Sequence, residues 1–123
     1  MKMFDNRLPR TERLAAARES LYASGNSPDP DILKHLNGEV FKKWREASGR
    51  TAPGDWLAGG SAPMLVVQCL SDRMAPPLNS WNLVMRRPNA RLMAIPNCGH
   101  AMIPEQPEAI STSVIAFLSE ARR

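Results

Sequence analysis

Two residues of this sequence carry the side chains of an acid–base pair, and each follows an apolar segment. Asp72 stands in Ser-Asp-Arg-Met-Ala-Pro after the apolar run 64–70, and His100 ends Asn-Cys-Gly-His after the run 91–95. An aspartate that binds one imidazole nitrogen fixes the tautomer of the histidine and leaves the other nitrogen free as a general base. Asp72 and His100 are therefore candidate catalytic residues.

Each candidate also has a purely structural interpretation. Aspartate is a common turn residue, so Asp72 is also compatible with bracing the turn that follows it. His100 stands beside Gly99 and is also compatible with a structural histidine in that turn. The other histidine, His35, stands between two expected helices and is expected at the surface.

The two apolar runs are expected to form parallel strands. Residues 64–70 and 91–95 are almost continuously apolar, which is typical of parallel strands that are buried on both faces. Adjacent strands lie ~4.8 Å apart, and ligands of open parallel sheets bind where the strands end. The side chains of Asp72 and His100 are therefore expected within hydrogen-bonding reach of each other.

Helices are expected from the spacing of apolar residues and from end signals such as proline, glycine and asparagine. A short turn is expected around Trp56 and Leu57. The expected helices are residues 11–22 (ended by Gly25), 39–48 (capped by Asn37), a helix opened by Pro76-Pro77 and closed by Pro88, and a last helix from Pro107 to Arg123.

The chain is expected to have an α/β fold in two parts, a helical segment over residues 1–58 and a βαβα unit over residues 59–123. Two parallel strands are too few for a stable sheet, because a strand that is apolar on both faces needs neighbouring strands and helices on each side. The sequence therefore predicts part of a larger sheet.

Two stretches resemble the late part of α/β-hydrolases, the loop that carries the triad acid and the loop that carries the triad histidine. The resemblance covers about Trp56 to the end, and residues 1–58 are similar in style to the helical cap of that family. By this resemblance Asp72 matches the triad acid and His100 the triad base, in the order that the family uses. The stretches are residues 62–77, APMLVVQCLSDRMAPP, and residues 95–108, IPNCGHAMIPEQPE.

The nucleophile that this family carries is absent from the sequence. The family places it in Gly-x-Ser-x-Gly on a sharp turn between a strand and a helix, and no such motif exists here. Ser61, in Gly-Gly-Ser-Ala-Pro, lacks the closing glycine and precedes the acid-bearing strand, so it is not expected to be a nucleophile. Cys69 stands where the family commonly has glycine. We expect the chain to supply acid and base, and to be inactive alone.

The resemblance implies a hydrolase that cleaves an ester or a related bond of a small molecule with a serine–histidine–aspartate mechanism, without a metal or organic cofactor. One alternative is a non-catalytic remnant or interaction module that docks through an unpaired sheet edge. Another is a split enzyme whose nucleophile lies on a separate chain. The partner would then be the missing amino-terminal half or a second copy of the chain.

Composition limits the other function classes. The 16 basic and 12 acidic residues give a net charge of +4, and the basic residues are dispersed, so no nucleic-acid interface is expected. No apolar run has the ~18 residues of a membrane span, and the start lacks the apolar segment of a secretory signal. Cys69 and Cys98 are expected as buried thiols in a reducing compartment, the cytoplasm. No metal-ligand spacing is present.

Overall fold

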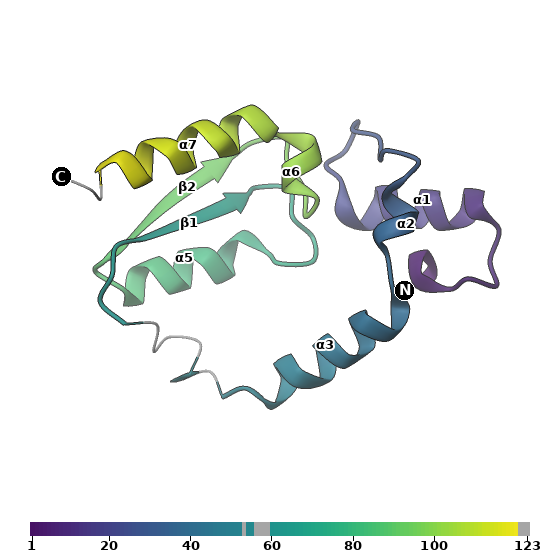
Figure 1. Cartoon of the computed structure of the whole chain (residues 1–123), viewed down its shortest axis with the longest axis horizontal. Helices are drawn as coiled ribbons and strands as arrows, with labels where there is room; N and C mark the ends of the chain where they lie inside the picture. The colour runs from purple at the N-terminus through teal and green to yellow at the C-terminus, as the bar shows by residue number, and fades with distance from the viewer. Residues whose placement is uncertain (53, 56–59, 121–123) are drawn as a thin grey trace.

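A computed structural model of the chain describes residues 1–52, 54–55 and 60–120. In it, a group of helices from the first half of the sequence lies beside a βαβα unit from the second half (Figure 1). The elements are η1 (Lys2–Phe4), α1 (Arg10–Leu21), α2 (Ile32–His35), α3 (Gly38–Arg50), β1 (Met64–Cys69), α5 (Pro77–Arg86), β2 (Ala90–Ile95), α6 (Met102–Glu105) and α7 (Pro107–Glu120).

The two expected strands are confirmed and pair in parallel. Their register runs from Met64 opposite Ala90 to Cys69 opposite Ile95. The ladder continues beyond the strands, because Leu70 N donates to Ile95 O at 2.9 Å. Within the described residues the sheet has two strands, so neither strand is flanked on both sides, as expected for part of a larger sheet.

The helices of the second half lie on opposite sides of the sheet, α5 along one side and α7 along the other (Figure 1). Proline fixes φ near the helical value and lacks the N–H that the first helical residues leave unpaired, so Pro77 and Pro107 open these helices. The expected helices are therefore confirmed. The short helix α6 between His100 and α7 was not expected from the sequence, and the expected end of the last helix at residues 121–123 lies outside the described residues.

The first expected helix is confirmed as α1, but Gly25 does not end it. The helix ends at Leu21, and Gly25 follows in a turn with φ +91°, a conformation that glycine adopts without steric cost. Ala17 and Leu21 are buried as the apolar spacing predicts, and they form a hydrophobic cluster with Met3 and Tyr22.

Helix α3 begins where the sequence predicts. The Asn37 side chain accepts hydrogen bonds from Glu39 N and Val40 N at 3.0 and 3.1 Å, which is the standard cap of a helix N-terminus. Its apolar face is mostly uncovered by the described residues, since Val40 and Trp44 are 62% and 59% exposed.

The sheet has its own hydrophobic cluster, made of Cys69, Ile95, Cys98 and Ile110. The buried members of the two clusters fall on either side of the expected division between residues 58 and 59, but Met74 and Ala101 of the second half pack against the first cluster, and the boundary itself stays a prediction. The turn expected at Trp56 and Leu57 lies outside the described residues. No helix in the described ranges is long and apolar enough to cross a membrane.

Candidate active site

Asp72 lies in the turn immediately after β1, and its carboxylate is fixed by the backbone. The side chain is 3% exposed. Its Oδ1 accepts hydrogen bonds from Met74 N and Ala75 N, both at 2.8 Å. The turn-bracing interpretation of Asp72 is therefore correct for one carboxylate oxygen, and the second oxygen is left for another partner.

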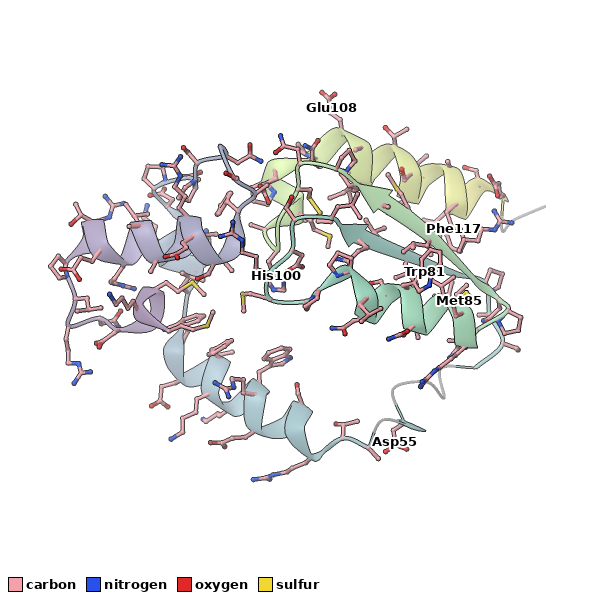
Figure 2. The ribbon with its side chains drawn as sticks, turned by 180° about the vertical axis from the view of Figure 1, so that it is seen from behind. Asp55, Trp81, Met85, His100, Glu108 and Phe117 are labelled. Atoms are coloured by element: carbon pink, nitrogen blue, oxygen red, sulfur yellow. A yellow bond between two sulfur atoms is a disulfide. The ribbon has the colours of Figure 1, made fainter. Side chains whose placement is uncertain are left out.

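That partner is His100. Asp72 Oδ2 lies 2.9 Å from His100 Nδ1, within the range of a hydrogen bond, so the structure brings both predicted residues together. Figure 2 marks the position of His100. The His100 side chain is 42% exposed, and its Nε2 forms no hydrogen bond with the residues that the structure describes. The imidazole is thus bound to the carboxylate on one side and open on the other.

This geometry is suited to proton transfer. In the tautomer with the proton on Nδ1, the ring donates to Asp72 and presents a lone pair on Nε2. When Nε2 takes up a proton, the adjacent buried carboxylate stabilises the imidazolium. The pair can therefore act as a general base toward a hydroxyl or water, and then as a general acid. His35 lies in α2, exposed, and takes no part.

The loop that carries His100 is packed against the end of α1. Ala101 N donates to Leu21 O at 2.8 Å. A Cβ on Gly99 would lie 2.5 Å from Leu21 O, 2.7 Å from Tyr22 C and 2.8 Å from Ala23 N. These atoms belong to the backbone and cannot swing aside, so only glycine permits this close approach.

Asn97 makes the sharp turn between β2 and the loop that carries His100 (the histidine loop). It has φ +49°, in the left-handed region that asparagine tolerates better than most residues. Its carbonyl accepts from Asn26 Nδ2 at 3.2 Å and from Gln106 Nε2 at 3.3 Å. The chain therefore turns sharply after β2 and runs back toward α1.

The expectation that Cys69 and Cys98 are free thiols is wrong in this structure, where they form a disulfide with their Cα atoms 4.8 Å apart. Cys69 ends β1 and Cys98 lies two residues before His100. Ser71 N also donates to Cys98 O at 2.9 Å. The end of β1, which leads into the loop that carries Asp72 (the acid loop), is thus joined to the histidine loop by a covalent bond as well as by a hydrogen bond. The expected reducing compartment stays a prediction.

Gln68, a buried polar residue that was not predicted as part of the site, stabilises the loop that carries Asp72. Gln68 is 5% exposed, and its Nε2 donates to Cys69 O at 2.7 Å and to Ala75 O at 3.2 Å. Its Oε1 accepts from the Ser80 hydroxyl in α5. A buried amide with satisfied donors fixes a single arrangement of the turn. The signal was present, since Gln68 interrupts an otherwise apolar run.

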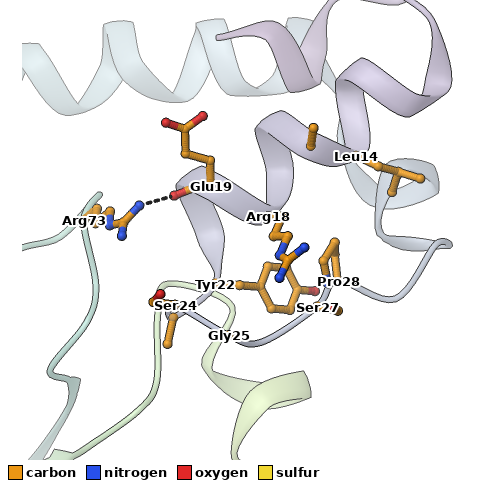
Figure 3. A pocket seen from close by; sticks show the side chains of 11 residues that line it. Leu14, Arg18, Glu19, Tyr22, Ser24, Gly25, Ser27, Pro28 and Arg73 are labelled. Atoms are coloured by element: carbon orange, nitrogen blue, oxygen red, sulfur yellow. Dashed lines mark hydrogen bonds between the residues drawn. The ribbon is translucent and has the colours of Figure 1, made fainter.

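A pocket of about 490 Å³ lies beside the candidate pair and does not include it. It is lined by the end of α1, the segment 22–28 and Arg73, and neither Asp72 nor His100 is among its walls (Figure 3). Arg73 Nη1 donates to Glu19 O at 2.9 Å across this pocket. Arg73 thereby attaches the acid loop to the same helix that supports the histidine loop. The described residues contain no cluster of three or more metal-ligating side chains.

Comparison with known proteins gives the fold. No protein-family model matches the chain. A solved serine hydrolase involved in carbazole degradation, CarC, superposes with a TM-score of 0.71 over 90% of this chain and 47% of its own, at 24% identity. A thermophilic esterase from Thermogutta terrifontis superposes with a TM-score of 0.60 over 93% of this chain and 47% of its own, at 22% identity.

Two curated relatives match half of the chain in sequence. A Mycobacterium tuberculosis protein named as a non-heme bromoperoxidase, BpoC, is 32% identical over 62 residues, or 50% of this chain and 24% of BpoC. The polyketide synthase ThaQ of Burkholderia thailandensis is 41% identical over 61 residues, which are 50% of this chain and 3% of ThaQ.

These likenesses, together with the parallel strands and their helices, show that the chain has the α/β-hydrolase fold. It forms the carboxyl-terminal part of that fold and spans about half the length of the solved structures that it matches.

Proposed function

We propose that this chain provides the acid and base of a catalytic triad in a hydrolase that cleaves an ester or a related bond of a small molecule. Asp72 orients His100, and His100 activates a nucleophile that lies outside these 123 residues. The observation that supports the proposal is the 2.9 Å contact between Asp72 Oδ2 and His100 Nδ1, with Nε2 open.

The proposed reaction has two steps. His100 Nε2 removes the proton of a serine hydroxyl as the oxygen attacks the ester carbonyl, and then returns it to the leaving alcohol. In the second step His100 takes a proton from water as the water attacks the acyl-enzyme, and returns it to the serine oxygen as the bond to the acyl group breaks and the acid is released. The chemistry needs no metal or organic cofactor. The fold alone does not determine whether the substrate is a simple ester, a lipid, an epoxide or another compound.

A chimera tests this assignment. The part of CarC that this chain does not cover would be joined to Met1, and hydrolysis of an activated ester such as p-nitrophenyl butyrate would be measured. We expect His100→Ala and Asp72→Asn each to lower kcat by about 10³- to 10⁴-fold. His35→Ala is the matched control and should leave kcat unchanged. A folded chimera whose turnover is indifferent to His100 contradicts the proposal.

The isolated chain gives a second check. Without a nucleophile, the remaining acid–base pair should not raise ester hydrolysis measurably above the rate of free imidazole. Turnover by the isolated chain that depends on His100 would show that the chain holds its own nucleophile. That result would refute the assignment of the nucleophile to another chain or segment.

A second candidate function is an interaction module, which is favoured by exposed apolar side chains on α5. Leu78, Trp81 and Met85 are 65%, 57% and 71% exposed, and β1 pairs only with β2 in the described part of the chain. An unpaired sheet edge together with exposed apolar side chains is a site for association. The same feature fits docking of a nucleophile-bearing half in a split enzyme. A monomeric chain at high concentration, measured by light scattering, would argue against self-association.

A further inference from the structure

Glu105, the last residue of α6, contacts both halves of the sequence through one carboxylate. Its Oε1 accepts hydrogen bonds from Ala23 N at 2.8 Å and from Asn26 Nδ2 at 2.7 Å. Its Oε2 accepts from Gly99 N at 2.6 Å. Bonds to a charged acceptor are short and stronger than neutral ones. The carboxylate therefore ties the segment after α1 to the residue that precedes His100.

The backbone of the histidine loop is consequently held on both sides of His100. On one side, Gly99 N is bound by Glu105. On the other, Ala101 N is bound by Leu21 O at 2.8 Å. The ring of His100 can meet the fixed carboxylate of Asp72 only when this stretch keeps its place, because Asp72 is itself immobilised by Met74 and Ala75.

We propose that Glu105 is a positioning residue for His100, a role that rests on the proposed function of the Asp72–His100 pair. Glu105 does not touch the imidazole. It acts through the Gly99 peptide and the segment 22–26, and it sets the place from which the His100 ring reaches Asp72.

The three hydrogen-bond partners of Glu105 require a carboxylate at this position. All three partners are N–H donors, and an ionised carboxylate is an acceptor at both oxygens. A glutamine keeps the size but turns one of the two oxygens into an NH₂ donor, which then faces a backbone N–H. An aspartate keeps the charge but is one methylene shorter and does not reach both segments together. Neither substitution reproduces the three bonds.

The test compares Glu105→Gln with Glu108→Gln in the full chain. Glu108 is exposed in the first turn of α7 and its side chain points away from the molecule (Figure 2), so it makes a matched control. Long-range ¹H–¹⁵N correlation spectra report the Nδ1–H of each imidazole, and the chain has two histidines. The exposed His35 is the internal reference.

We expect the wild-type chain and Glu108→Gln to show a protected Nδ1–H on His100, and Glu105→Gln to lose it with an unchanged far-ultraviolet circular dichroism spectrum. Persistence of the protected Nδ1–H in a folded Glu105→Gln chain overturns the positioning role and leaves the proposed function intact. Its absence from the wild-type chain removes the pair itself and with it the proposed function.

Should Glu105→Gln fail to fold, Glu105→Asp takes its place, because the shorter carboxylate keeps the charge and does not bind Gly99 N and the segment 22–26 together. A weakened His100 Nδ1–H signal in this variant supports the positioning role, and a signal equal to that of wild type overturns it.

Discussion

Replacing Gly99 with alanine tests how tightly the histidine loop is packed against α1. A Cβ at this position would meet only backbone atoms, at 2.5 Å from Leu21 O, 2.7 Å from Tyr22 C and 2.8 Å from Ala23 N. Backbone atoms at a helix end cannot move aside as a flexible side chain can. The histidine loop must therefore retreat from α1.

The distance by which the histidine loop must move away from α1 determines the expected loss of stability. Ordinary contact begins at about 3.4 Å, so the Cβ must move by roughly 0.9 Å from its 2.5 Å position. After this shift, the hydrogen bond from Ala101 N to Leu21 O, now 2.8 Å long, exceeds the distance limit of such bonds. The bond from Gly99 N to Glu105, now 2.6 Å long, approaches that limit. At about 1–2 kcal/mol for each weakened bond, the free energy of unfolding falls by about 2–4 kcal/mol.

Urea unfolding followed by circular dichroism measures this change. The control is Gly49→Ala in α3, where a Cβ meets nothing within 4 Å. Alanine favours a helix over glycine by about 0.5–1 kcal/mol, so this variant should be more stable than wild type. Replacing glycine with alanine is thus expected to lower the free energy of unfolding at position 99 and to raise it at position 49.

Unfolding of Gly99→Ala at the same urea concentration as wild type would contradict the close packing of the histidine loop against α1. A destabilised Gly99→Ala chain that keeps the protected Nδ1–H of His100 would also contradict it, because the loop would then have accommodated the methyl group without losing the contact to Asp72.

Three further predictions concern parts of the structure outside the candidate pair. The purified chain should show no free thiol before reduction, and reducing the disulfide, which closes a separation of 29 residues, should lower the unfolding free energy by about 3–4 kcal/mol; full thiol reactivity at the start would contradict this. Asn37→Ala should cost about 1 kcal/mol by removing the cap of α3, and an unchanged urea midpoint would argue against that cap. Burial and, to a lesser degree, the charge of Glu105 raise the pKa of Tyr22, the single tyrosine of the chain, so absorbance at 295 nm should titrate above the usual value near ~10. Since the folded chain holds the phenol proton more tightly than the unfolded chain, stability should be unaffected below pH ~10 and fall above it; a normal tyrosine titration in the folded chain would be inconsistent with this burial.

Much of the second half could be predicted because its patterns are local. The apolar runs at 64–70 and 91–95 gave both strands to within a residue, and the prolines gave the starts of α5 and α7. The meeting of Asp72 with His100 followed from one rule, that parallel strands deliver their following loops to the same edge.

The same rule would have paired the cysteines. Cys69 ends β1 and Cys98 follows β2, so strand pairing brings them together as it does Asp72 and His100. The expectation of free thiols came from cysteine number and compartment, which carry no information about distance. Spatial proximity was the missing consideration.

The support given by Glu105 could not be predicted. Its partners Ala23 and Asn26 lie about 80 positions earlier in the sequence, and no periodicity of either segment states that they meet. The close approach at Gly99 is equally a property of how α1 sits on the histidine loop. Contacts between separately predicted elements depend on packing, which local patterns do not encode.

The most direct measurement of the central claim is the ¹H–¹⁵N spectrum of His100 in the wild-type chain and in Asp72→Asn. We expect the wild-type imidazole to be held as the Nδ1–H tautomer with a protected proton, and Asp72→Asn to abolish this protection while His35 stays unchanged. A His100 spectrum that matches that of exposed His35 and does not respond to Asp72→Asn would contradict the acid–base pair.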